Sequence, residues 1–307
     1  MKPRSLELID ALRDPNAKRA GSSARAIAEA HGVEIYHLRH LAWALEYCGF
    51  AGHTVLEVGG SLPRGLISEF TEVRNWVCLE YIPYYEELNS KLRKEYTTLC
   101  EGLDPHGLEL CQVISGAIED LPGCWNGRFD SIFSVACFEH ITRLPLGLAA
   151  MAKALSPQGK DSDRKPKGSG RLYSGFAPIW SSASGYHMSL GEIPYLDSSI
   201  GHEDVFFDYM HLLMSPVELF YHLREGIGEV CASHVVYHIH HSNHINRLYI
   251  PDYVLALKSE NRFSGEILPY ARRQIPDRLK AYILSKQSRA IGLEYDGLII
   301  RAEVSKT

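Results

Sequence analysis

The chain has 307 residues, of which 45% are apolar and 22% are charged. This composition is that of a globular protein, and the length is enough for one large domain with additions. Because 32 basic residues face 37 acidic ones, the net charge of -5 offers no broad cationic field to nucleic acid or anionic lipid. We therefore expect a small or locally recognised substrate, with no nucleic-acid partner and no membrane partner.

The cysteines and the N-terminal segment indicate in which cellular compartment the protein is expected. Seven cysteines are scattered along the chain without a CxxC pair, a pattern typical of reduced thiols. Charges interrupt the apolar residues near the N-terminus, and nowhere do about 18 apolar residues run together, so the sequence predicts neither a secretion signal nor a membrane span. These features favour a cytoplasmic protein, and they leave open whether it forms a homo-oligomer.

Two helices are predicted in the first fifty residues. Over residues 4–14 and 22–48, apolar side chains recur at steps of three and four, the spacing of a helix with one buried face. Gly49 and Gly52 then break the pattern. Residues 1–50 are therefore expected to form an N-terminal helical extension.

From residue 51 the pattern becomes an alternation of strands and helices. Short apolar runs predict strands at 54–58, 76–80, 109–114, 129–135 and 171–176. The intervening segments able to form helices are 65–73, 83–99 and 144–155. Such alternation predicts an α/β fold, with a mostly parallel Rossmann-like sheet and helices on both faces, over residues 51–180.

The last third departs from this alternation. Residues 177–212 are rich in Ser, Gly, Tyr and His without a clear period, which suggests an ordered loop or lid. Beyond it we expect a helix at 216–223, a strand at 229–240, a helical insertion at about 251–290 and a final strand at 297–304. The sequence thus divides into a lid and insertion at 181–290, which includes one core strand at 229–240, and a final core strand within 291–307.

Polar residues and glycines gather where the predicted strands end. The first strand runs through Glu57 into Gly59 and Gly60, a turn whose backbone a ligand can approach without obstruction by a Cβ atom. Glu80 ends the second strand, where an acidic side chain can accept hydrogen bonds from both hydroxyls of a ribose. Two further stretches follow in order, Gly116–Pro122 and Phe129–Ile141.

These four stretches, taken in order, resemble the motifs of the class I S-adenosylmethionine-dependent methyltransferases over about residues 50–180. The resemblance implies S-adenosylmethionine as the cofactor. It assigns the amino-acid end of the ligand to Glu57, the turn beneath it to Gly59, Gly60 and Ser61, and the ribose to Glu80. It further places Tyr81, Ile82, Ile118 and Glu119 around the adenine, and Ala136, Cys137 and Phe138 beside the sulfonium.

Three departures from the family pattern qualify these roles. Ser61 and Pro63 stand where the family usually has glycines, and proline lacks an N–H group, so the turn must differ in detail. Ala117 stands where the third motif often has Asp. Ala136 stands where metal-binding relatives with a Glu-His pair have a further carboxylate. We therefore predict no metal at Glu139 and His140, and expect this pair to cap the following helix or support the cofactor.

A second histidine-rich tract allows two interpretations. If residues 229–240 form a strand, His234, His238 and His240 share one face, with His241 and His244 close behind. Converging imidazoles could bind zinc or another divalent ion. The tract has no Cys or Asp partner nearby, however, and the face could simply be solvated, which is the interpretation we favour.

Aromatic residues and histidines after the fifth strand suggest an acceptor pocket. Trp180 and Tyr186 could form its walls or pack the lid on the core, and His187 or His211 could be the general base. The prediction is a methyltransferase that O-methylates a small natural product or sugar-like metabolite. A macromolecular acceptor, supported only by the basic stretch 160–171, and a non-catalytic binding module, suggested by Ser61 and Pro63, remain alternatives. Whether O, N or C is methylated stays open.

Overall fold

The computed structural model describes residues 9, 12, 22–60, 62–83, 95–156 and 169–304. Most of the helix expected over residues 4–14 lies outside this part of the chain. So do Ser61 and nearly all of the basic stretch 160–171.

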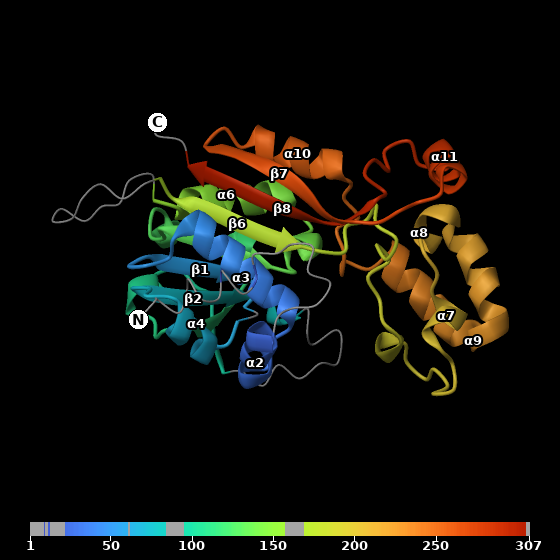
Figure 1. Cartoon of the computed structure of the whole chain (residues 1–307), viewed down its shortest axis with the longest axis horizontal. Coiled ribbons are helices and arrows are strands. Elements are labelled where there is room, and N and C mark those ends of the chain that lie inside the picture. The colour runs from blue at the N-terminus through green and yellow to red at the C-terminus, as the bar shows by residue number, and fades with distance from the viewer. Residues whose placement is uncertain are drawn as a thin grey trace.

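The centre of the protein is one mixed sheet with the strand order β3-β4-β2-β1-β5-β6-β8-β7 (Figure 1). Its first six members are parallel, while β8 runs antiparallel to both β6 and β7. The strands are β1 (Thr54–Val58), β2 (Asn75–Glu80), β3 (Tyr96–Thr98), β4 (Gln112–Ser115), β5 (Ser131–Val135), β6 (Arg171–Phe176), β7 (Phe263–Arg272) and β8 (Tyr295–Val304). The expected mostly parallel α/β sheet is confirmed.

Helices cover both faces of the sheet (Figure 1). One apolar core joins the sheet to α2 (Ser22–His31), α3 (Ile35–Cys48) and α4 (Arg64–Phe70). The other joins it to α6 (Leu144–Ala154) and α10 (Ile250–Ser259). Because β1, β2 and β5 are buried along their whole length, they appear in the sequence as continuous apolar runs rather than alternating ones.

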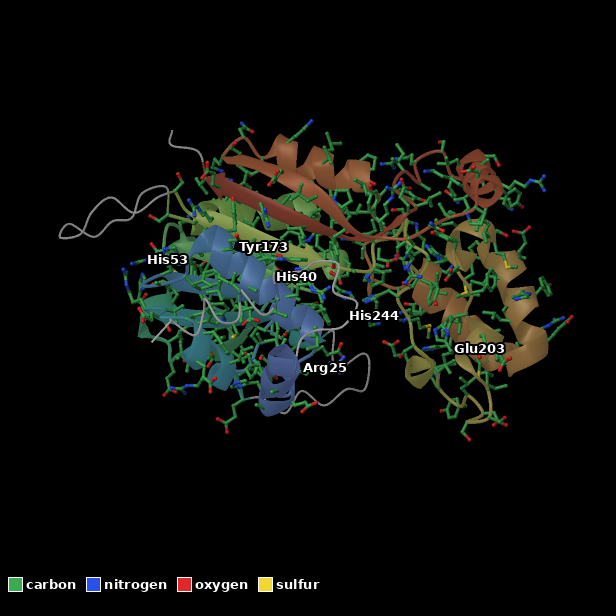
Figure 2. The ribbon with its side chains drawn as sticks, viewed as in Figure 1. Arg25, His40, His53, Tyr173, Glu203 and His244 are labelled. Carbon is green, nitrogen blue, oxygen red and sulfur yellow. The ribbon has the colours of Figure 1, made fainter. Side chains whose placement is uncertain are left out.

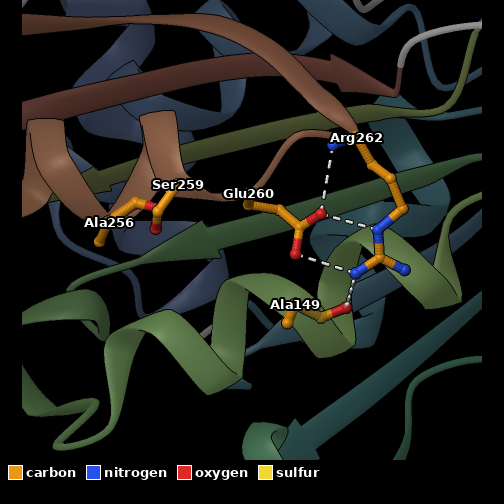
Figure 3. A network of polar contacts seen from close by, with 5 residues as sticks. All are labelled: Ala149, Ala256, Ser259, Glu260 and Arg262. Carbon is orange, nitrogen blue, oxygen red and sulfur yellow. Dashed lines mark hydrogen bonds and ion pairs between the residues drawn. The ribbon is translucent and has the colours of Figure 1, made fainter.

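Two polar contacts fasten helices to this core. His40 of α3 and Tyr173 of β6 form a buried hydrogen bond of 2.9 Å between Nδ1 and the hydroxyl oxygen (Figure 2). Gly175 makes room for it, because a Cβ atom there would overlap the His40 ring. On the other face, Arg262 donates to both carboxylate oxygens of Glu260 and, at 3.1 Å, to the Ala149 carbonyl of α6 (Figure 3).

A helical cap lies beyond the carboxyl ends of the parallel strands (Figure 1). It contains α7 (His202–Val205), α8 (Met210–Leu213), α9 (Pro216–His240) and α11 (Asp277–Lys286), and it has an apolar core of its own. Helix α9 begins with a capping box between Ser215 and Glu218, with proline in the first turn. It bends at Gly228, whose φ of 79° is not helical. Within the described residues, no helix has the length and apolar character needed to span a bilayer.

Several predicted elements need correction. The strand expected at 229–240 is wrong, because these residues form the second half of α9, and Ala232, Val235 and Ile239 are buried at helical spacing. The insertion expected at 251–290 is not all helical, since it contains the edge strand β7. The helix expected at 22–48 is two helices separated at Gly32, and the end of the one expected at 83–99 is the short strand β3.

Candidate active site

Four strand ends meet at one edge of the sheet and place their turns side by side. The Gly59 N–H donates to the Leu79 carbonyl at 2.9 Å, and the Gly116 N–H donates to the Glu80 carbonyl at 3.0 Å. The chain proceeds from β1 to one side and then returns to β5 on the other, so the strand order reverses between them. Ligands of open parallel sheets bind at the carboxyl ends of strands beside such a reversal.

A cavity of about 370 Å³ opens at this reversal. Its volume is in the range of small-ligand and cofactor sites, roughly 300–1,000 Å³. The residues that line it come from the four turns and from one segment of the cap: Val58, Gly59, Leu79, Glu80, Tyr81, Gly116, Ala117, Ile118, Glu119, Asp120, Ala136, Cys137, His140, Ile141, Thr142, Arg143, Asn243 and His244.

The glycine turn touches two neighbouring strand ends. Gly59 and Gly60 have φ values of 101° and 47°, which side chains other than glycine rarely adopt. A Cβ atom on Gly59 would lie 2.8 Å from the Cβ of Cys137, and one on Gly60 would lie 2.9 Å from Oε2 of Glu80. The turn, Glu80 and Cys137 are therefore close enough together to contact one nucleoside-sized molecule.

Glu57 lies behind this turn and braces it. Its fully buried carboxylate accepts hydrogen bonds from the Leu62 N–H at 2.9 Å, the Trp76 Nε1–H at 2.7 Å and the Cys78 thiol at 3.4 Å. Glu57 is not among the residues that line the cavity. Its hydrogen bonds hold the turn in place, and the direct ligand contact expected from the resemblance remains a prediction.

The other residues expected at the cofactor divide into two groups. Tyr81, Ile118, Glu119, Ala136 and Cys137 line the cavity together with Glu80 and Gly59, whereas Ile82 and Phe138 are buried and do not line it.

The cavity wall is acidic. It carries three carboxylates, Glu80, Glu119 and Asp120, against one arginine, Arg143, which approaches Asp120 at 3.3 Å and Glu119 at 3.9 Å.

Part of the wall could not be found by reading strand ends. Arg143 follows the fourth turn, and Asn243 and His244 return from the cap to the sheet edge, where Figure 2 shows His244. The Asn246 side chain fixes this return, because its Nδ2 donates to the Phe138 carbonyl at 2.7 Å and to the Ile141 carbonyl at 3.1 Å. In the sequence, only the polar character of residues 243–246 suggested a contact with a ligand. That character did not indicate which strand end these residues would lie against.

Histidines gather where the cap meets the sheet. The rings of His140 and His187 lie 4.7 Å apart, and those of His238 and His244 are stacked at the same distance. His187 lines a second cavity of about 420 Å³, with Tyr186 and Glu192 among its other residues. Because His140 lines the first cavity and its ring contacts that of His187, this pair of rings lies between the two cavities.

Burial changes the ionisation of the groups at this junction. Loss of solvent lowers the pKa of His187 to about 3 and that of His140 to about 4, and it raises the pKa of Glu139 to about 8. Both imidazoles are therefore uncharged at neutral pH. They are also weak proton acceptors, since a general base works best with a pKa near the working pH.

His211, the other expected base, lies inside the cap. It is 2% exposed, and its Nε2 contacts the Trp180 carbonyl oxygen at 2.7 Å, where the imidazole must be the donor. It lines neither cavity. Trp180 is buried in the same core, 4.5 Å from the His211 ring. Both residues therefore pack inside the cap, whereas Tyr186 and His187 line the second cavity. A catalytic role for His211 remains a prediction.

The expected face of His234, His238 and His240 is not formed, because these residues are helical and only His234 and His238 share a helix face. His238 and His240 point to different neighbours, His238 toward the carbonyl of His187 and His240 toward Trp180.

Comparison with known proteins gives structural likenesses only. No protein-family model matches the chain, and no curated protein matches it. It is similar to the protein that a Haloferax volcanii complex pairs with the Trm112 methyltransferase activator, with 14% identity, 97% and 98% of the two chains covered and a TM-score of 0.42. It is also similar to an S-adenosylmethionine dependent methyltransferase from Mesorhizobium loti, with 12% identity, 83% and 92% coverage and a TM-score of 0.40. A third similar structure is geranyl diphosphate C-methyltransferase from Streptomyces coelicolor, with 12% identity, 96% and 88% coverage and a TM-score of 0.41.

Proposed function

We propose that this chain is a methyltransferase that binds S-adenosylmethionine in the cavity at the strand ends. The observation that carries the proposal is the contact of the Gly59–Gly60 turn with Glu80 and Cys137 beside an acidic cavity of about 370 Å³. In this proposal residues 51–180 bind the donor, and residues 181–290 supply the wall that faces the acceptor.

The charge of the cavity favours this ligand over a dinucleotide. A pyrophosphate needs several N–H donors at the turn and the following helix. Here the Leu62 N–H is already bonded to Glu57, and Pro63, which precedes α4, has no N–H. Three carboxylates against one arginine would repel a diphosphate, but they suit a ligand that carries a sulfonium and an ammonium group.

Each wall of the cavity has a task in this proposal. When bound, S-adenosylmethionine supplies an electrophilic methyl group on a cationic sulfur. Glu80 accepts hydrogen bonds from the ribose hydroxyls, Ile118 and Tyr81 border the base, and Cys137 lies near the reacting atoms. The cap excludes water and keeps the acceptor in line with the methyl group, which is where most of the acceleration of such a transfer arises.

We propose a hydroxyl of a small polar molecule as the acceptor. The second cavity adjoins the first at His140 and His187 and is lined by polar residues, among them Ser184, Ser189 and Glu192. A hydroxyl oxygen held there would attack the methyl carbon, the carbon–sulfur bond would break with its electron pair going to sulfur, and the hydroxyl proton would pass to a base. Of the two expected bases, His187 is the one that lines the second cavity, although its low pKa makes it a weak base.

Calorimetric titration tests the donor site directly. We expect the wild-type protein to bind S-adenosylmethionine and S-adenosylhomocysteine, and not NAD⁺. Glu80→Gln should weaken S-adenosylhomocysteine binding at least about tenfold, because charge-assisted hydrogen bonds contribute roughly 1.5–3 kcal/mol. Glu109→Gln, whose side chain is 83% exposed outside the cavity, is the matched control and should bind as the wild type does. No heat with either sulfur ligand, or tighter binding of NAD⁺, would refute the proposal.

A further inference from the structure

A cluster of possible metal ligands lies at the junction of the two cavities. Glu139 and His140 come from the turn after β5, and His187 comes from the cap. One ligand atom from each of the three lies within 4.8 Å of the others. In the ranges given above for the described chain, no other three residues of this kind come so close.

The carboxylate of this cluster is buried, and no other residue in the described part of the chain donates a hydrogen bond to it. Glu139 is 1% exposed, and neither of its oxygens accepts a hydrogen bond from another residue in the described part of the chain. Leaving a buried polar group unsatisfied costs several kcal/mol in an apolar environment, so such groups are nearly always bonded. A cation beside Glu139 would satisfy both oxygens at once.

The surrounding contacts hold the ligands as metal sites require. The Nδ1 of His140 lies at the carbonyl oxygen of His244, so in the neutral ring Nδ1 carries the proton and Nε2 carries the lone pair. A carbonyl that accepts from the other ring nitrogen is the usual outer contact of a histidine ligand. The turn itself is fixed by Asn246, whose main-chain N–H donates to the Glu139 carbonyl at 2.8 Å.

His187 is held in an uncommon backbone conformation. Its φ of 46° lies in the left-handed region, which costs a residue other than glycine of order 1 kcal/mol and persists only where the surroundings impose it. The His187 carbonyl accepts from Nε2 of His238 at 3.3 Å, which ties it to α9. The imidazole of His187 lies close to Glu139 and His140.

We propose that Glu139, His140 and His187 bind one divalent ion of the first-row transition metals. Two imidazoles and one carboxylate are the ligand set of catalytic zinc and of mononuclear iron sites, and they leave coordination positions open. The sequence pointed away from a metal because Ala136 removes the upstream carboxylate. The cap supplies the third ligand instead, from a position that sequence spacing does not connect to Glu139.

The role of the ion follows from its place. His140 lines the donor cavity and His187 lines the second one, so the ion would lie where a donor and an acceptor meet. There it would lower the pKa of a coordinated acceptor hydroxyl, so that its proton is lost more readily. His140 and His187 would then act as ligands of the ion and not as general bases. This role rests on the proposed function, but the binding of the ion does not.

Titration of the chelator-treated protein with CoCl₂, without any sulfur ligand, tests the site. We expect one equivalent of Co²⁺ to bind with the visible absorption of a protein-bound ion. Glu139→Gln and His187→Asn should each weaken Co²⁺ binding at least about tenfold. His234→Asn removes a histidine of the rival tract in α9 and should leave binding unchanged. Absence of the absorption band, or equal affinity in His187→Asn, would overturn the proposal.

Two further measurements keep this result independent of folding and of the donor site. Thermal unfolding of each metal-free variant shows whether it is folded, and Co²⁺ should raise the melting temperature of the wild type more than that of His187→Asn. Titration of the metal-free wild type with S-adenosylhomocysteine tests the donor cavity alone. If that ligand binds while Co²⁺ does not, the metal proposal fails and the proposed function stands; the converse result refutes only the function.

Discussion

Two turns at the same edge of the sheet each carry a fully buried glutamate, and the protein surrounds them differently. Glu57, at the end of β1, accepts hydrogen bonds from Leu62, Trp76 and Cys78. Glu139, after β5, accepts none from another residue in the region that the structure describes. The first carboxylate is bonded within its own fold and helps to hold the turn. The second has oxygens that the described protein does not use, which is what a ligand site requires.

The difference also shows in the ionisation of the second turn. Burial raises the pKa of Glu139 to about 8, which favours its neutral form near pH 7 in the absence of a cation. A glutamine at this position copies the shape of that neutral form. A glutamine at Glu57, by contrast, would point an NH₂ group at groups that are themselves donors.

The largest expected difference in stability is between two single variants, Glu57→Gln and Glu139→Gln. Glu57→Gln should lower the free energy of unfolding by roughly 3 kcal/mol, because it removes a charged acceptor and leaves buried donors unsatisfied. Glu139→Gln should change the metal-free protein by less than about 0.5 kcal/mol or stabilise it. Urea unfolding of the two variants beside the wild type, after chelator treatment, measures both values.

Equal destabilisation by the two substitutions would contradict the comparison. It would mean that Glu139 is bonded within the fold as Glu57 is, and it would weaken the case for a metal at this turn.

The glycine turn offers a second test, in which a matched control separates backbone strain from steric overlap. Gly59→Ala adds a Cβ atom 2.8 Å from the Cβ of Cys137 at a φ of 101°. Gly127→Ala also has a positive φ, 67°, which is less unfavourable than that of Gly59, and no atom lies within 4 Å of its added Cβ. We expect S-adenosylhomocysteine to bind Gly59→Ala at least about 30-fold more weakly, near 2 kcal/mol, and Gly127→Ala as it binds the wild type.

Calorimetry gives the affinities, and the unfolding curve of Gly127→Ala reports the cost of a positive φ without overlap, about 1–2 kcal/mol. Gly59→Ala should lose more stability than this control, because its added Cβ atom also overlaps Cys137. Unchanged affinity in Gly59→Ala would show that the turn does not shape the cavity.

The sequence predicted those parts of the fold whose residues are buried on both sides. The strands β1, β2, β5 and β6 are short apolar runs bounded by turns, and they were found at nearly their observed bounds. The edge strand β7 was not predicted, because most of its residues are exposed or half-buried. Its sequence therefore has neither an apolar run nor a clear alternation of apolar and polar residues. The helical half of α9 was taken for a strand because Val235, Tyr237 and Ile239 alternate with histidines, whereas the buried positions follow the helical spacing.

The candidate site was predictable only on its sheet side. Glu80, Gly59 and Cys137 lie at the ends of strands whose order in the sheet can be inferred from a βαβ pattern, so their proximity could be expected. The structure places the Gly59–Gly60 turn against Glu80 and Cys137. Arg143 and His244 were not connected to this cavity, because the return of the cap to the sheet edge depends on tertiary contacts such as those of Asn246. The roles of individual residues at the cofactor, and the division of the chain into functional units, remain predictions.

A buried histidine extends the comparison from carboxylates to the core of the cap. His211 resembles Glu57 in being held by its own fold, through the Trp180 carbonyl, and burial lowers its pKa to about 3. An unfolded histidine has a pKa near 6.5, so the unfolded chain takes up the proton first as the pH falls. The stability that the neutral ring provides is therefore present above about pH 6.5 and is lost progressively as the pH falls toward 3.

Between pH 7 and pH 5 this single group should cost the wild type roughly 2 kcal/mol of unfolding free energy. The glutamine of His211→Gln cannot take up that proton. Between pH 7 and pH 5 the unfolding free energy of this variant should therefore fall by about 2 kcal/mol less than that of the wild type, although the variant is less stable at pH 7. His222→Gln, at an exposed position of α9, is the control and should follow the wild type. Urea unfolding at the two pH values measures the difference. If His211→Gln and the wild type lose equal stability, the cap does not hold the His211 ring in its neutral form. The ring would then be more accessible to solvent than its contact with Trp180 implies.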